Sequence, residues 1–360
     1  MTFTFETLPI KGKEILREGI LEHFHRDIST VPCVFGSRNY AFIFGEGCFP
    51  AIIRVGAETA QQGVQDVLSE LMWLDDLKND IPNICQPIPS LENRMVERIA
   101  VGEVVYLVTM FRKANGATFP DTQWNAEHFY NAGALLGKIH RISSEGYQRG
   151  FRYKRRHWDE SVFCDFSCFE GSFASAVQQD AQAVLQRIQR IPRDPRWYGM
   201  IHGDFQNGNL FCDWGELRVF GFDDCCYGYF MYDIVALAHI FIHGLNYAGA
   251  RPGMTARDCM LGQDGILTHI RAGYTSEYSL PEEQWELFDD FFRLRVAQIV
   301  SYQLHLKLHQ KDIQFALFEP ILAYLKCDQS PIDQIDEVKR VAFSRLTPEI
   351  YRVLSQSFTG

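Results

Sequence analysis

The stretch MIHGDFQNGNL (residues 200–210) is a dense patch of polar side chains and glycines, and it decides the fold. It places Asp204 and Asn209 five residues apart, in a loop that Gly203 and Gly208 allow to bend sharply. A carboxylate can accept the proton of an attacking hydroxyl, and an amide oxygen is a hard ligand for Mg²⁺. The pair therefore suits phosphoryl transfer to a hydroxyl. An ordinary polar loop is the alternative, since Asn, Asp and Gly are common in loops.

The sequence around this loop resembles one family. In the aminoglycoside phosphotransferase and choline kinase superfamily, relatives of protein kinases, H-G-D-x-x-x-x-N is followed by a strand that ends I-D-F, then a glycine, then Y-D-L-A. The matching residues here are His202, Gly203, Asp204, Asn209, Phe222, Gly228, Tyr232, Asp233, Ile234 and Ala236. The spacing holds throughout, and the resemblance covers roughly residues 30 to 245.

The resemblance implies an α+β, bilobal, protein-kinase-like fold. Residues 1–112 would form a nucleotide-binding lobe, a small antiparallel β-sheet with one main helix, and residues 113–360 a larger, mainly helical lobe that holds the catalytic and acceptor-binding groups. Hydrophobic patterning agrees with this layout. Strand-like runs occupy 33–55, 93–100 and 104–111, and helical periodicity occupies 11–25, 60–77, 126–142, 172–191, 231–245 and 282–308. Residues 246–265 are glycine-rich and are expected to form a loop.

Several nucleotide-binding residues are implied by the resemblance. Arg54 stands where the family has a strand lysine, and Glu70 where it has the glutamate that pairs with that lysine. A guanidinium can still bind phosphate oxygens at two points. Ser37 would lie in the turn that covers the phosphates. Met110 and Phe111 would form the hinge at the adenine base, with Phe211 and Phe220 beneath it; both phenylalanines are equally good core residues.

The stretch RVFGFDDC (218–225) departs from the family pattern. Its register makes Gly221 the position of the family's second metal-binding aspartate. With Gly221 in the middle of a strand, alternation would point Asp223 to the same face, roughly 7 Å further along. Asn209 and Asp223 are thus the candidate Mg²⁺ ligands, and Asp204 is the catalytic base. His202 and Asp233 are expected to support the loop. The glycine leaves three interpretations open: compensation by Asp223, a silent protein, or a variant of an active parent.

The composition bounds the remaining possibilities. The 360 residues are 46% hydrophobic and have a formal charge of −10, which argues weakly against a nucleic-acid partner. No basic leader precedes an apolar run, and no apolar stretch approaches about 18 residues, so we expect a cytoplasmic protein without membrane contact, as a monomer or homodimer.

We therefore expect an ATP- and Mg²⁺-dependent kinase that acts on a hydroxyl of a small molecule such as an amino alcohol, a homoserine-like compound or an aminoglycoside. The alternatives are a pseudokinase that binds a nucleotide or a partner without turnover, and a protein serine/threonine kinase.

Overall fold

An antiparallel sheet forms the first part of the molecule. The computed structural model describes residues 10–35, 39–45, 50–59, 62–82, 84–118, 123–150, 153–167, 172–244 and 265–307. The strand order is β1-β2-β3-β6-β4, and β5 pairs with β6. The strands are β1 (Cys33–Phe35), β2 (Asn39–Phe44), β3 (Ala51–Ala57), β4 (Pro87–Ile88), β5 (Glu97–Val101) and β6 (Val104–Arg112).

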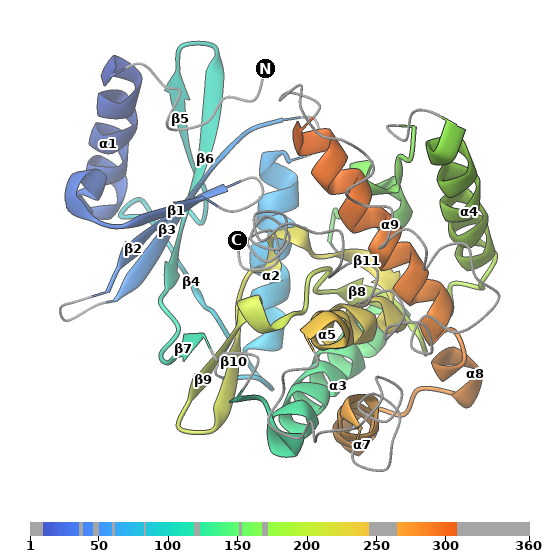
Figure 1. Cartoon of the computed structure of the whole chain (residues 1–360). Coiled ribbons are helices and arrows are strands. Elements are labelled where there is room, and N and C mark those ends of the chain that lie inside the picture. Colours follow the sequence, from blue (N-terminus) through green and yellow to red (C-terminus); the bar gives the residue numbers. More distant parts are fainter. Residues whose placement is uncertain are drawn as a thin grey trace.

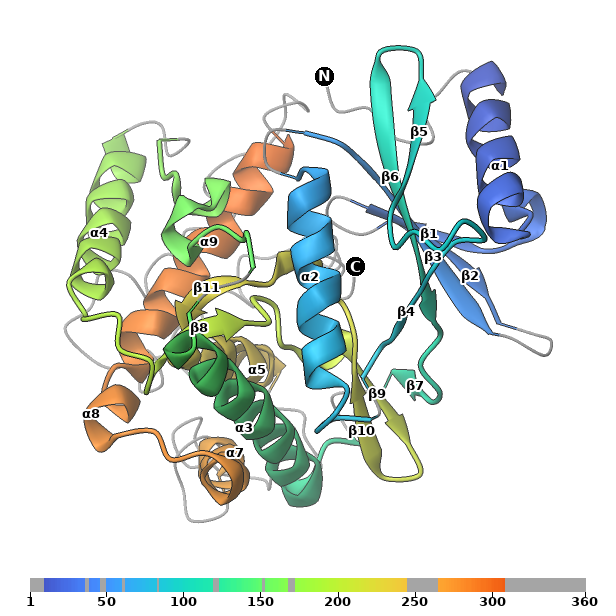
Figure 2. The same cartoon turned by 180° about the vertical axis from the view of Figure 1, so that it is seen from behind.

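Two helices cover opposite faces of this sheet, α1 (Ile10–Phe24) and α2 (Val64–Leu77), as Figures 1 and 2 show from the two sides. Strand alternation explains the arrangement: Ile53 and Val55 of β3 are buried under α1, while Arg54 points the other way. The apolar face of α2 joins a different core, which continues into the second half of the chain through Trp73. The helix α2 therefore packs against both the sheet and the second half of the chain.

The second half is mainly helical, with short strands that carry the loops of the site. Its elements are β7 (Ala117–Thr118), α3 (Ala126–Gln148), α4 (Ser172–Gln189), β8 (Tyr198–Ile201), β9 (Leu210–Asp213), β10 (Glu216–Val219), β11 (Cys226–Tyr229), α5 (Phe230–Gly244), α7 (Ile266–Glu277), α8 (Glu282–Trp285) and α9 (Phe288–Lys307). The helices α3 and α7 approach to backbone contact, because a Cβ on Gly133 or Gly273 would lie 2.1 or 1.9 Å from a main-chain oxygen of the other helix.

The predicted fold class is confirmed by this arrangement of an antiparallel sheet followed by a helical part. The prediction of one helix over 282–308 is wrong, because the helix is interrupted between α8 and α9. Strand β7 pairs with β9, so the chain has joined the second half by Ala117. The division into lobes at residue 112 stays a prediction. The glycine-rich segment 246–265 lies outside the described residues except at its last position.

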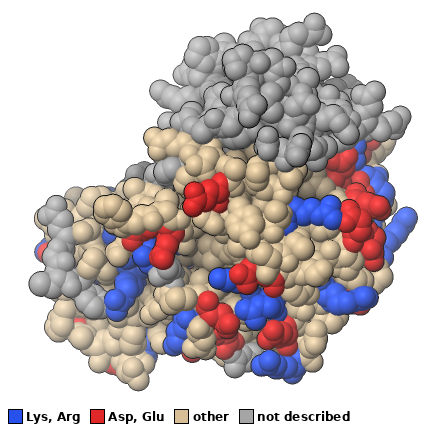
Figure 3. Space-filling view, turned by 90° about the horizontal axis from the view of Figure 1, so that it is seen from below, with Lys and Arg blue, Asp and Glu red and all other residues tan. Residues whose placement is uncertain are grey.

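The surface and the helices give two further observations. On the face drawn in Figure 3, basic and acidic side chains of the described residues lie interspersed. Within the described ranges, every helix is too short or too polar to span a bilayer.

Candidate active site

Both carboxylate oxygens of Asp204 accept hydrogen bonds from neighbouring side chains. Its Oδ2 accepts hydrogen bonds from Nε2 of Gln206 at 2.8 Å and Nδ2 of Asn209 at 3.1 Å. Its Oδ1 accepts one from Nη2 of Arg295 in α9. The amide group of Asn209 also donates to the Asp204 carbonyl at 2.9 Å. The amide nitrogen of Asn209 is therefore committed to Asp204, and its amide oxygen faces the other way, toward Gly221.

The loop that carries Asp204 is fixed by buried polar contacts. Asp233, in the first turn of α5, accepts the backbone N–H groups of His202 at 2.7 Å and Gly203 at 2.8 Å. The His202 ring bridges to the Phe220 carbonyl through Nε2 and accepts the Asp204 N–H at Nδ1, which fits an imidazole protonated on Nε2. Gly203 has φ +84°, and a Cβ there would lie 2.4 Å from the Asp224 carbonyl oxygen. His202 and Asp233 therefore both contact the loop that carries Asp204, and their role as supports of a catalytic loop stays a prediction.

A buried histidine on α3 extends this support. The Nε2 atom of His140 lies 3.4 Å from Asp233, its Nδ1 lies 2.9 Å from the Tyr274 hydroxyl, and its ring stacks on Phe230 at 4.3 Å. Burial lowers the pKa of His140, although Asp233 opposes the shift. The imidazole is thus kept uncharged at neutral pH inside the scaffold.

The expectation that Gly221 lies within a strand is wrong. Strand β10 ends at Val219, and Gly221 has φ +79°, in the left-handed region. It begins a 3₁₀ turn (Phe222–Asp224), so alternation along a strand does not describe Asp223. The close approach of Asn209 explains why the position is tight: a Cβ on Gly221 would lie 2.6 Å from Oδ1 of Asn209.

The turn directs Asp223 toward the sheet. Its Oδ2 accepts a hydrogen bond at 3.0 Å from Nδ2 of Asn39 in β2, whose own amide oxygen accepts from Gln62. The negative charge of Asp223 also contributes to raising the pKa of Arg54. Asp223 therefore contacts the sheet through Asn39 and lies close enough to Arg54 for their charges to interact.

Arg54 and Glu70 form an ion pair at two points. The two terminal nitrogens of the guanidinium, Nη1 and Nη2, each donate to the Glu70 carboxylate at 2.8 Å. The side chain of Glu70 is 2% exposed. The guanidinium also lies 4.9 Å from the centre of the Phe111 ring. Burial alone would lower the pKa of Arg54, but Glu70 and Asp223 outweigh it and raise the pKa. The substitution of arginine for the family lysine thus keeps a charged pair between β3 and α2.

The remaining nucleotide-site residues lie at different depths. Met110 and Phe111 are buried in β6, flanked by β3 on one side and β4 on the other, so the chain leaves the sheet only after Arg112. The hinge over Met110 and Phe111 therefore stays a prediction. Phe211 and Phe220 are partly exposed, with ring centres 4.5 Å apart in an edge-on pair. Ser37 lies outside the described residues.

Two arginines that sequence patterns had not indicated complete the site. The guanidinium of Arg155 donates to three main-chain carbonyls, those of Asp66 at 3.1 Å, Asp223 at 2.7 Å and Cys225 at 2.6 Å. It thereby joins the start of α2 to the turn after Gly221. Arg295 holds Asp204 from α9. Both contacts join segments that are 68 to 91 residues apart, so no local motif could have revealed them.

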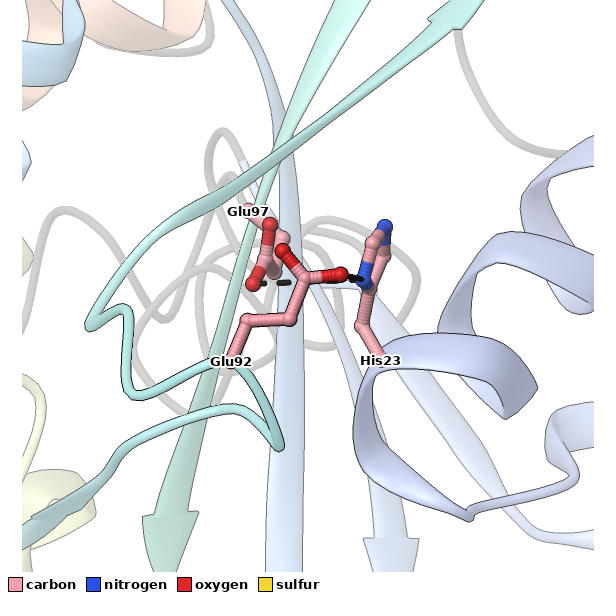
Figure 4. Close-up of side chains that lie close together, drawn as sticks. All are labelled: His23, Glu92 and Glu97. Carbon is pink, nitrogen blue, oxygen red and sulfur yellow. Dashed lines mark ion pairs between the residues drawn. The ribbon is translucent and has the colours of Figure 1, made fainter.

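Two features lie away from this site. His23, Glu92 and Glu97 place possible ligand atoms within 4.8 Å of one another (Figure 4). Arg94 already binds both glutamates, which makes this a charge network rather than a metal site. A cavity of about 520 Å³ opens between α2 and the end of α3, and Trp73, Asp76 and Tyr153 are among its lining residues.

Comparison with known proteins gives concordant matches. The model of the "Phosphotransferase enzyme family" matches residues 30–258. An amicoumacin kinase of Bacillus subtilis (strain 168) is 26% identical over 260 residues, which are 72% of this chain and 75% of that protein.

Solved structures share the fold. One is an amicoumacin kinase in complex with AMP-PNP, Ca²⁺ and Ami, with a TM-score of 0.75, 22% identity, and coverage of 90% of this chain and 93% of that one. A microcompartment-associated aminopropanol kinase has a TM-score of 0.67 and 21% identity, covering 92% and 99%. A spectinomycin phosphotransferase in complex with ADP and spectinomycin has a TM-score of 0.56 and 16% identity, covering 89% and 96%.

Proposed function

Since the chain belongs to the phosphotransferase enzyme family, we propose that it transfers the γ-phosphoryl group of ATP, with Mg²⁺, to a hydroxyl of a small molecule. The observation that carries this proposal is the geometry of Asp204. Its carboxylate is anchored by Gln206, Asn209 and Arg295, while the Asn209 amide oxygen is turned away and available as a hard ligand.

The proposed reaction is a single displacement at phosphorus. The acceptor hydroxyl donates a hydrogen bond to the Asp204 carboxylate, which orients the oxygen for attack on the γ-phosphorus. The new oxygen–phosphorus bond forms as the bond between the γ-phosphorus and the β,γ-bridging oxygen breaks, and ADP leaves with that electron pair. The hydroxyl proton passes to Asp204 and then to solvent. The anchoring of Asp204 limits the orientational freedom that would otherwise oppose this step.

The metal and phosphate ligands follow from the same contacts. Asn209 and Asp223 would hold Mg²⁺, whose chemistry is to neutralise phosphate charge during transfer. The donor set fits, since one amide and one carboxylate oxygen are ligands that Mg²⁺ accepts while it keeps several waters. Asp223 must then exchange its hydrogen bond from Asn39 for the ion. Arg54, positioned by Glu70, would bind the α- and β-phosphates.

The nucleotide base and the acceptor are assigned by analogy with the relatives. Phe211 and Phe220 would lie beneath the adenine, Met110 and Phe111 would form the hinge whose backbone faces it, and Ser37 would lie over the phosphates. The names of the relatives, amicoumacin kinase and aminopropanol kinase, support a hydroxyl-bearing small molecule as acceptor. A cytoplasmic location and a monomeric or homodimeric state remain predictions.

A second candidate function rests on Gly221. Without a carboxylate at that position the protein could bind nucleotide and still not turn it over. A thermal-shift titration with ATP, with and without Mg²⁺, separates the two functions, because a kinase requires the metal for tight binding.

Turnover is then measured as ADP release in the presence of hydroxyl compounds, with Asp204→Asn as the inactive control. Release that requires both acceptor and Asp204 supports the kinase. Stabilisation that ignores Mg²⁺, with no release above the control, supports the silent protein.

A further inference from the structure

Helix α9 brings a positive charge into the centre of the proposed reaction. Arg295 donates from Nη2 to Oδ1 of Asp204, and its side chain is only 16% exposed. The guanidinium carbon also lies 6.0 Å from the ring centre of Tyr232, whose hydroxyl is tied to Gln298. Aromatic packing and the ion pair hold the guanidinium in one place.

The hydrogen bonds of Asp204 indicate where an acceptor hydroxyl can bind. Each carboxylate oxygen accepts about two hydrogen bonds. Oδ2 already accepts from Gln206 and Asn209, whereas Oδ1 accepts from Arg295. The remaining acceptor position is on Oδ1, which is the oxygen beside the guanidinium. A hydroxyl that binds there has Arg295 as its immediate neighbour.

The donors of Arg295 are only partly used. A guanidinium carries five N–H donors and stays charged at all accessible pH values. One donates to Asp204, a second interacts with the Tyr232 hydroxyl, and Nε is buried with no hydrogen-bond partner among the described residues. Nε itself is too deeply buried to meet a ligand. The terminal N–H groups, on a side chain that is still 16% exposed, are the donors that can meet an oxygen atom of the acceptor.

We infer that Arg295 is a specificity-determining residue, which binds an oxygen function on the carbon next to the hydroxyl that is phosphorylated. This inference rests on the proposed function. It names the acceptor class as a hydroxy acid, a hydroxy amide or a vicinal diol. An ammonium group on that neighbouring carbon is repelled by the guanidinium, so an amine in the acceptor must be further from the reacting hydroxyl.

Three compounds with one carbon skeleton test the inference. Lactate, 1,2-propanediol and 1-amino-2-propanol share the CH(OH)CH₃ group. The next carbon is the carboxylate carbon in lactate, and it bears a hydroxyl in the diol and an ammonium in the amine. We expect kcat/KM for lactate and the diol to exceed that for the amine on the order of 100-fold, because a site built to bind an oxygen discriminates strongly against a group that cannot accept a hydrogen bond.

The variants Arg295→Gln and Arg295→Lys are compared with the parent chain. Arg271→Gln is the control, because Arg271 pairs with Glu282 on the surface of α7, away from Asp204. We expect Arg295→Gln to reduce the preference by at least tenfold, mainly through KM for the acceptor, with Arg295→Lys intermediate and the control unchanged. Equal loss for all three compounds, with their ratio preserved, would mean that Arg295 only positions Asp204 and would overturn the inference.

Binding measurements decide the case if none of the three compounds is phosphorylated. Saturation-transfer NMR of the protein with AMP-PNP and Mg²⁺ then compares the same compounds. Binding of lactate or the diol that is lost in Arg295→Gln supports the inference, and binding that is absent or unchanged overturns it. Mg²⁺-dependent stabilisation by ATP is measured in parallel, so that a failure of the proposed function is recognised separately.

Discussion

Replacing Gly221 with alanine should destabilise the protein by about 2–3 kcal/mol, from two separable causes. The first is the left-handed backbone at φ +79°, which costs an L-residue about 1–2 kcal/mol. The second is the close approach of Asn209, whose Oδ1 would lie 2.6 Å from the new Cβ. Moving that side chain weakens a hydrogen bond to Asp204, which contributes a net amount of about 1 kcal/mol.

Gly215 provides the matched control. It has nearly the same backbone conformation, φ +87°, but a Cβ there meets no atom within 4 Å. Gly215→Ala should therefore cost only the backbone term of about 1–2 kcal/mol. The difference between the two alanine variants, measured by urea unfolding, isolates the effect of Asn209. Equal destabilisation in the two variants would show that Asn209 moves aside freely and would refute the steric argument.

Gly221→Asp should behave differently when nucleotide is present. Aspartate tolerates the left-handed region better than alanine, and its carboxylate would stand beside the Asn209 amide oxygen. We expect stabilisation by ATP to appear at a lower Mg²⁺ concentration than in the parent chain. A tenfold gain in affinity adds about 1.4 kcal/mol at saturating ligand. An unchanged Mg²⁺ dependence would show that Asp223 already supplies the carboxylate that the metal needs.

The other predictions concern the groups that surround the site. Glu70→Gln removes the charge that balances buried Arg54 and should cost about 3 kcal/mol in urea unfolding, with weaker ATP binding. Arg155→Lys replaces a planar fork with a single ammonium group, so amide exchange in the turn at 222–225 should rise at least tenfold while α3 stays protected. The lowered pKa of His140 means that the unfolded chain, where histidine titrates near 6.5, binds more protons than the folded chain. The stability that the buried, uncharged His140 contributes is therefore complete above about pH 6.5 and is lost as the pH falls below it. The variant His140→Gln should flatten the decline in the free energy of unfolding between about pH 7 and pH 5.

The sequence was informative where chemistry is encoded at short range. The spacing within HGDFQNGN predicted a bent loop with Asp204 and Asn209 together, and the structure has that contact. Alternation in β3 separated Arg54 from its apolar neighbours. The loop and the alternation depend on local geometry, which residue spacing reports directly. The pairing of Arg54 with Glu70 was implied by the family resemblance, and the structure contains that pair.

The errors and omissions depend on tertiary contacts or on backbone dihedral angles. Gly221 follows an apolar run that is typical of a continuous strand, but the pairing of β10 ends at Val219 and the backbone of Gly221 is left-handed. Asn39 reaches Asp223 across 184 residues, and Arg295 reaches Asp204 across 91. A lone asparagine or arginine on a surface-like pattern carries no sign of such a partner.

The three hydrogen bonds that Arg155 donates, here called the Arg155 clamp, have a consequence for how sequences in this family can diverge. All three of its acceptors are main-chain carbonyls, those of Asp66, Asp223 and Cys225. The side chains at these three positions can therefore change without loss of the clamp, provided that the backbone path is kept. Among relatives that share the clamp, the arginine should persist with no covarying partner. Methods that infer contacts from correlated substitutions would then miss this connection between α2 and the turn after Gly221.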